Sequence, residues 1–205
     1  MPHSKLKISI FTIWLFHIVG VIGIKLGFYD FFLPKSWLTL VLSSSLLLLN
    51  SRYSNNVYLL LVVFLGFTAE VIGVATGAIF GSYTYGENLG FKAIGVPLVI
   101  GLNWLMLAIL ARTVALSFCR NMYFRILLSA MIMVALDLLI EPFAPKFDYW
   151  TFEGGYPGWQ NYLGWFLVAL PLQYILEKSR IEPNRKFAWN LLGAQILFFL
   201  AFWYV

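Results

Sequence analysis

The chain has few charged residues: only 11% of its 205 residues are Asp, Glu, Lys or Arg, while 61% are hydrophobic. Soluble globular domains carry about 25% charged residues, so this composition is that of an integral membrane protein. Strand-like alternation is absent, and an open sheet cannot satisfy its backbone in lipid. We therefore expect an all-α, polytopic transmembrane helical bundle, with residues 1–205 forming a single domain.

Histidine, cysteine and aspartate are also scarce. The two histidines, His3 and His17, are too few for a zinc site or for a membrane di-iron centre. The one cysteine, Cys119, excludes an internal disulfide. Three aspartates form no paired motif for magnesium diphosphate, and no lysine after Lys186 could form a retinal Schiff base. Phosphate loops, dinucleotide fingerprints and nucleophile elbows are missing too.

What the sequence does contain is a series of apolar windows of membrane-spanning length. The second window is the weakest, because it is short and three consecutive serines interrupt it. We expect seven transmembrane helices, over Ile8–Phe28, Lys35–Asn50, Asn56–Gly81, Lys92–Leu116, Tyr123–Glu141, Tyr162–Leu176 and Phe187–Val205.

The basic residues report the orientation of these helices. With seven helices and the N-terminus inside, ten Lys and Arg residues face the cytoplasm and four face outward. Six helices with the N-terminus outside give the same ratio, but Lys5 and Lys7 close to the first helix favour seven. We expect a bacterial cytoplasmic membrane and a retained first helix. The basic residues form no interleaved patch, so no nucleic-acid partner is expected, and the oligomeric state stays open.

Three carboxyl groups, Glu70, Asp137 and Glu141, lie inside or at the mouth of apolar segments, where charge is costly and acids are functional candidates. Asp137 and Glu141 are one turn apart and share a face. At a rise of about 1.5 Å per residue, Glu70 and Asp137 can share one layer. Because no Lys or Arg side chain lies at that depth to neutralise them, we expect at least one of these acids to be protonated. Both acids also have a simpler, structural interpretation. Glu70 could be hydrogen-bonded inside the bundle, and Asp137 could be hydrogen-bonded to Asn103.

Glycines and aromatic residues surround these acids. Gly66, Gly73, Gly77 and Gly81 form a small-residue stripe beside Glu70, which either packs helices closely or admits a long flat chain. Tryptophan and tyrosine collect at membrane interfaces, but ring faces also stabilise cations in desolvated sites. Asn161 either caps the sixth helix or belongs to the site.

Two blocks of residues carry a resemblance to a known family. The first is Glu70-x-x-Gly73-x-x-x-Gly77-x-x-Phe80-Gly81-x-Tyr83-x-Tyr85, running on through Leu89-Gly90 and Gly95-Val96-Pro97 to Trp104; the second is Leu136-Asp137, Glu141-Pro142, Ala144, Trp150, Pro157, Asn161 and Gly164-Trp165. With these blocks the chain resembles the integral-membrane carotenoid biosynthesis proteins, which include carotenoid 1′,2′-hydratases of the bisanhydrobacterioruberin and gamma-carotene type. Phe152 stands where a second tryptophan is expected.

The resemblance implies addition of water across the terminal C1=C2 double bond of an acyclic carotenoid (psi) end group, giving a tertiary alcohol without metal or redox cofactor. We expect Asp137 to be the general acid and Glu70 or Glu141 to position and deprotonate the water, although acid and base could be exchanged. A non-catalytic carotenoid or lipid binder and a proton-coupled transporter are the alternative functions. The expected substrate-binding residues are Gly73, Gly77, Tyr83, Tyr85, Asn103, Trp104, Trp150, Asn161 and Trp165.

Overall fold

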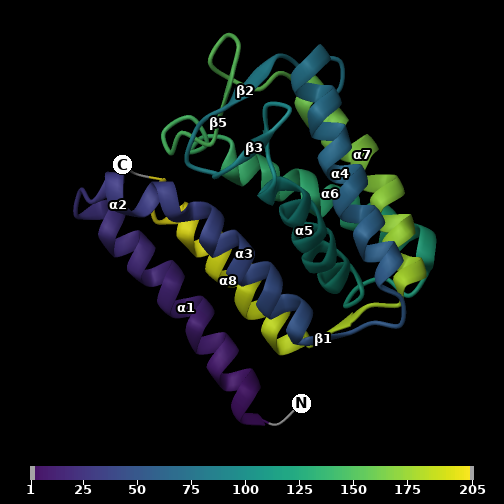
Figure 1. Cartoon of the computed structure of the whole chain (residues 1–205). Helices are drawn as coiled ribbons and strands as arrows, with labels where there is room; N and C mark the ends of the chain where they lie inside the picture. Colours follow the sequence, from purple (N-terminus) through teal and green to yellow (C-terminus); the bar gives the residue numbers. More distant parts are fainter. Residues whose placement is uncertain (1–2, 204–205) are drawn as a thin grey trace.

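The computed structural model describes residues 3–203 and confirms an all-α bundle (Figure 1). A four-residue helix α2 (Tyr29–Phe32) and a 3-10 turn η1 (Leu33–Lys35) lead into the second long helix. The seven long helices of the described chain are α1 (His3–Lys25), α3 (Ser36–Leu49), α4 (Asn56–Thr76), α5 (Val99–Ala115), α6 (Met122–Ile140), α7 (Trp159–Ser179) and α8 (Arg185–Leu200).

Four helical stretches in the described residues are long and apolar enough to cross a membrane: Ser4–Lys25, Tyr29–Leu49, Asn56–Thr76 and Met122–Ile140. Helix α5 is apolar but shorter. The second stretch joins α2, η1 and α3 into 21 residues. The weak second window therefore gains its spanning length from residues that precede it.

Several helix boundaries differ from the predicted ones. The third helix ends at Thr76 instead of Gly81, because Gly77 takes the left-handed conformation (φ +66°) and its N–H closes the last turn on Gly73. The fourth begins at Val99 instead of Lys92, since Lys92–Pro97 forms a hairpin. The first helix begins before Ile8. Residues 204 and 205, predicted to end the last helix, lie outside the described part.

Short strand pairs, which the sequence did not predict, tie the connections together. Strands β1 (Ser51–Arg52) and β6 (Glu182–Pro183) pair at one end of the bundle. At the other end, β2 (Tyr83–Tyr85) pairs with β5 (Trp150–Phe152), and β3 (Lys92–Ala93) with β4 (Val96–Pro97). The β2–β5 pair joins two long connections into a cap over α4–α7.

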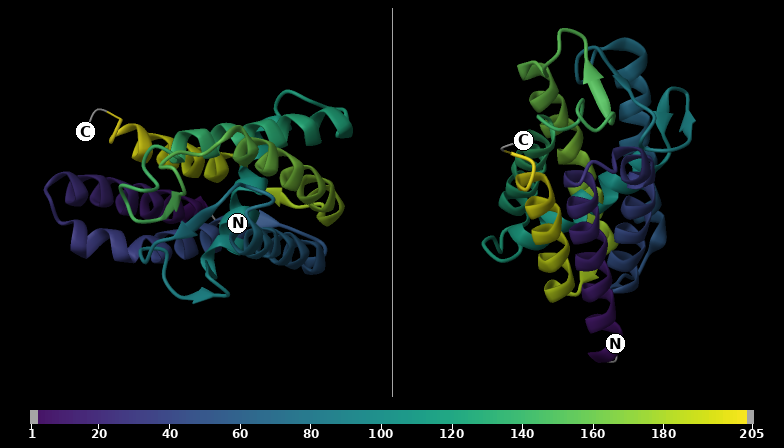
Figure 2. Two further views of the ribbon diagram at one scale, coloured as in Figure 1. Left: turned by 90° about the horizontal axis from the view of Figure 1, so that it is seen from above. Right: turned by 90° about the vertical axis from the view of Figure 1, so that its left-hand side faces the viewer.

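Helix α5 lies at the centre, where it packs against α3, α4, α6, α7 and α8 and buries nearly its whole length. Helix α1 lies at the edge and packs mainly on α8. Figures 1 and 2 show the N-terminus at one end of the bundle and the C-terminus near the other. Alternating helix directions thus bring the β2–β5 cap and the ends of α1, α4 and α6 to the same end.

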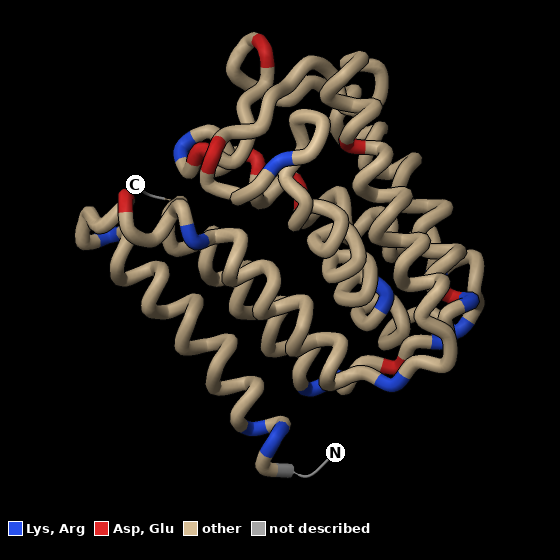
Figure 3. Tube along the Cα trace, viewed as in Figure 1, with Lys and Arg blue, Asp and Glu red and all other residues tan. Residues whose placement is uncertain are grey.

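Charge is distributed unevenly along the bundle axis (Figure 3). Ten of the 14 Lys and Arg residues belong to the start of α1 or to the α3–α4, α5–α6 and α7–α8 connections and their adjoining turns. We refer to this as the basic end. Seven of the nine acids lie towards the opposite, capped end, which matches the asymmetry expected of a positive-inside protein.

Candidate active site

The Glu70 carboxyl group lies beneath the cap and accepts three hydrogen bonds. It projects from α4 and is only 3% exposed. Its Oε2 accepts hydrogen bonds from the hydroxyls of Tyr83 and Tyr85, the latter at 2.8 Å, and its Oε1 accepts from Trp104 Nε1 at 2.9 Å. Three neutral donors from β2 and α5 therefore fix this carboxyl group in one orientation.

Strand geometry explains why both tyrosines reach the same acid. Residues two apart on a strand point to the same face, so Tyr83 and Tyr85 both face Glu70. The register places Phe152 opposite Tyr83 and Trp150 opposite Tyr85. The corresponding ring centroids are 5.3 and 6.2 Å apart. The short β2–β5 ladder thus positions four rings beside one carboxyl group.

Asp137 and Glu141 form the second acidic element, at the end of α6. Both carboxyl groups accept from the amide of Asn161: its Nδ2 lies 2.7 Å from Asp137 Oδ2 and 3.2 Å from Glu141 Oε1. Trp150 Nε1 also donates to Glu141, at 3.2 and 3.3 Å. Asp137 Oδ1 is buried and has no hydrogen-bond partner within the described residues. One amide on α7 therefore bridges the two acids, which share a face as their one-turn spacing predicted.

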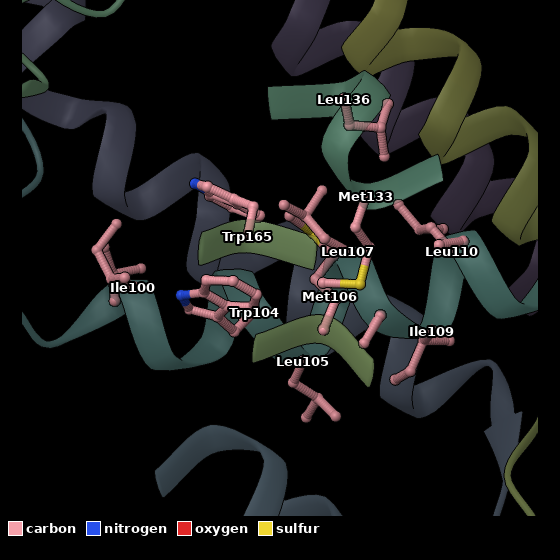
Figure 4. Packing of buried hydrophobic residues seen from close by; sticks show 14 of the residues in the cluster. Ile100, Trp104, Leu105, Met106, Leu107, Ile109, Leu110, Met133, Leu136 and Trp165 are labelled. Atoms are coloured by element: carbon pink, nitrogen blue, oxygen red, sulfur yellow. The ribbon is translucent and has the colours of Figure 1, made fainter. Parts of the chain in front are cut away.

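Two stacked indoles form one side of the site. The rings of Trp104 on α5 and Trp165 on α7 lie 4.1 Å apart and nearly parallel, at 21° (Figure 4). Their nitrogen-bearing edges point in the same direction. Phe80, from the cap, lies 6.3 and 6.4 Å from these two rings. The acids are thereby enclosed by aromatic faces.

A small cavity of about 20 Å³ lies between the acids. Glu70 and Glu141 line it together with the amides of Asn103 and Asn161 and the surrounding rings. A water molecule needs roughly 10–15 Å³ of such space and two to four polar partners. The cavity therefore has the size and the polar lining for a single water molecule.

A larger cavity of about 420 Å³ adjoins the small one. Its wall is mainly apolar and comes from α1, α3, α5, α6 and α8 with the adjoining cap. The two cavities share Ile100, Asn103 and Trp150. An elongated apolar molecule bound in the larger cavity would therefore place one end against the small, acid-lined one.

Tyr149 lies in the wall of the large cavity, in the connection after α6. Its hydroxyl is 2.8 Å from Ser36 Oγ. Burial raises the pKa of Tyr149 to about 12, and the hydrogen bond with Ser36 opposes part of that rise. Tyr149 is therefore a neutral group at ordinary pH and ties the start of α3 to the cap.

Comparison with known proteins identifies the family of this chain. A family described as carotenoid biosynthesis protein matches residues 51–205. The chain belongs to this family. A bisanhydrobacterioruberin hydratase from Haloarcula japonica is 35% identical over 113 residues, which are 48% of this chain and 36% of that protein. The chain thus aligns with little more than a third of that relative's length. No solved structure matches.

The family match contains every acid of the site and the whole cap, whereas α1 and α3 precede it. Within the match, the small cavity brings together most of the residues singled out from the sequence. They are Glu70, Tyr83, Tyr85, Asn103, Trp104, Glu141, Trp150, Asn161 and Trp165. Phe80, Ile100 and Phe152 also line it. Phe80 and Phe152 stood in or beside the family blocks, but Ile100 had no signal beyond its place one turn before Trp104.

Asp137 and two glycines lie outside both cavity linings. Asp137 meets Asn161, and not Asn103 as its simpler interpretation supposed. A Cβ atom at Gly73 would lie 2.6 Å from the Phe80 ring, so this glycine makes room for Phe80. Gly77 ends α4 in the left-handed conformation. The structure thus gives Gly73 a packing role and Gly77 a role in ending the helix.

Proposed function

We propose that this protein is a carotenoid hydratase, which adds water across the terminal C1=C2 double bond of an acyclic carotenoid end group to give a tertiary alcohol. The observation that carries the proposal is the pairing of cavities: space for one water between Glu70 and Glu141, adjoining a larger apolar cavity. Family membership supports a carotenoid as the molecule bound there.

The carotenoid chain would occupy the larger cavity and reach it from the bilayer. Its end would lie at Ile100, Asn103 and Trp150, where the two cavities adjoin. Apolar walls suit a polyene, and burying it gains about 25 cal/mol for each Å² removed from water. Asn103 is the polar residue common to both linings, so its amide is placed to orient the water beside the double bond.

The acid in this mechanism is the Asp137–Glu141 pair. Two carboxyl groups that share one amide donor cannot both ionise cheaply. A proton shared by the pair can reach the substrate through Glu141, since Glu141 lines the cavity. Asp137, which the sequence analysis assigned as the acid, then shares its proton with Glu141 and does not contact the substrate itself. Protonation at C2 leaves the positive charge on tertiary C1.

Aromatic rings stabilise the cation that forms. Trp104, Trp150, Tyr83 and Tyr85 surround the small cavity, and ring faces attract cations electrostatically. Because these rings are fixed by hydrogen bonds and stacking, they need no reorganisation as charge develops. Water then attacks C1 and its proton passes to Glu70.

The step is balanced: one C–H and one C–O bond form, the alkene π bond breaks, and water is consumed. Glu70 ends with the proton that the acid pair has lost. Transfer through the next water entering the cavity restores both groups. We further propose that the protein lies in a bacterial cytoplasmic membrane with its N-terminus and basic end inside, which places the acids towards the outer side.

Expression in a bacterium that accumulates lycopene or gamma-carotene, grown in ¹⁸O-labelled water, tests the proposal. We expect a new pigment heavier by one labelled water, detected by mass spectrometry. Pigment retained on the protein with unchanged mass would instead indicate a carotenoid binder. Proton flux in vesicles without any new pigment would indicate a transporter. Unlabelled oxygen in the product would contradict hydration.

A further inference from the structure

The basic end of the bundle contains a hollow that the hydratase proposal does not use. It has a volume of about 550 Å³ and lies where the ends of α5 and α7 meet β6 and the start of α8. Three arginines, Arg112, Arg180 and Arg185, line it together with Glu177 and Glu182. The hollow is therefore polar and lies where helices emerge from the apolar part of the bundle.

A buried ion cluster forms the floor of this hollow. Arg112 Nε and Nη2 donate to the two oxygens of Glu177 at 3.0 and 3.3 Å. Arg125 Nε and Nη2 donate to the same two oxygens at 2.7 and 2.8 Å. Arg112 Nη1 further donates to the Ile181 carbonyl at 3.0 Å. Two planar guanidinium groups thus share one carboxylate, which leaves a rigid floor with a net positive charge.

Two further arginines line the hollow without a partner in the described chain. Arg180 ends α7 in the left-handed conformation (φ 51°), and Arg185 begins α8. Both are exposed, and their guanidinium groups make no hydrogen bond or ion pair within the described chain. Glu182 also lines the hollow. Its backbone pairs with that of Arg52 across the β1–β6 ladder, but its carboxylate forms no ion pair within the described residues.

We propose that this hollow binds a phosphate group, with Arg180 and Arg185 as its ligands. Guanidinium groups present pairs of N–H donors that match phosphate oxygens. The phosphate can belong to an anionic lipid headgroup or to a soluble anion. Basic pockets between transmembrane helices on the cytoplasmic side are suited to such headgroups. A headgroup bound here would hold together α5, α7 and α8 at the end opposite the acids.

Thermal unfolding of the full-length protein in lipid nanodiscs tests this site. The Arg180→Gln/Arg185→Gln double variant is compared with Lys178→Gln/Lys186→Gln. The control removes two neighbouring charges from the same end, but neither lysine lines the hollow. Equal melting temperatures in phosphatidylcholine alone verify that both variants fold.

Addition of phosphatidylglycerol is expected to raise the melting temperature of the wild type and of the lysine control. The arginine variant should require roughly tenfold more anionic lipid for the same shift. Inorganic phosphate is the second probe: a shift with phosphate alone supports the site and assigns it to a soluble anion, whereas a shift with lipid alone assigns it to a headgroup. Equal loss in both double variants, or loss in neither, would overturn the proposal.

Discussion

Glu70→Gln is the substitution that most directly tests the proposed chemistry. Glutamine has the same shape as glutamate but cannot take a proton from water. The two tyrosine hydroxyls on Oε2 can rotate to accept a hydrogen bond, whereas the indole N–H of Trp104 on Oε1 can only donate. The glutamine oxygen will therefore face Trp104, and its amide nitrogen will face the tyrosines.

This geometry allows the two effects of the substitution to be separated. Exchanging three hydrogen bonds to a carboxylate for three to an amide should lower the free energy of unfolding by about 1–3 kcal/mol. Loss of the base should slow hydration by about 10²–10⁴-fold. The protein should thus remain folded in the membrane and lose nearly all activity.

The assay is pigment mass spectrometry in membranes that contain equal amounts of wild-type and variant protein. Glu87→Gln is the matched control, because Glu87 is exposed in the cap and pairs only with Lys92 at the surface. If Glu70→Gln hydrated pigment as fast as Glu87→Gln, Glu70 could not be the base, and the single-water cavity would lose its proposed purpose.

Three further substitutions test the support of the site. Asn161→Ala leaves two buried carboxyl groups without their shared donor, so we expect a loss of about 1–3 kcal/mol in thermal or denaturant unfolding; unchanged stability would contradict the bridge. Trp104→Phe keeps the ring stack but removes the donor to Glu70, which should lower kcat about tenfold, as timed pigment conversion will measure. Gly73→Ala should cost about 1–3 kcal/mol by displacing Phe80, and Phe80→Leu in the same chain should restore part of it.

The acids illustrate what the sequence could predict about the site. A carboxyl group in an apolar segment indicates a functional site, because burying its charge in lipid is energetically costly. The spacing of Asp137 and Glu141 placed them on one face. The convergence of Tyr83 and Tyr85 on Glu70 was not predicted, because it depends on strand β2, which the sequence did not indicate. The roles within the pair could not be predicted, because they depend on which acid faces the cavity, and that is decided by Asn161 on another helix.

The glycines and the helix boundaries illustrate what could not be predicted. The spacing of Gly73 and Gly77 suits a groove for a chain as well as it suits close packing, and the Phe80 side chain that fills the space lies beyond the helix. The predicted fourth helix included Lys92–Pro97, because hydropathy alone does not distinguish a short hairpin from a first helical turn. Gly95, with φ +78°, forms that hairpin.

The position of α1 has a consequence for how this helical scaffold can diversify. The acids and the aromatic cap all come from the portion after residue 50, while α1 and α3 supply much of the wall around the larger apolar cavity. Since α1 rests chiefly on α8, its lining side chains can change size with little effect on the acidic centre. Under the proposed function, the reaction and the choice of pigment would be encoded on separable segments. Exchanging the first fifty residues between relatives is then expected to alter which pigment fits while preserving the reaction.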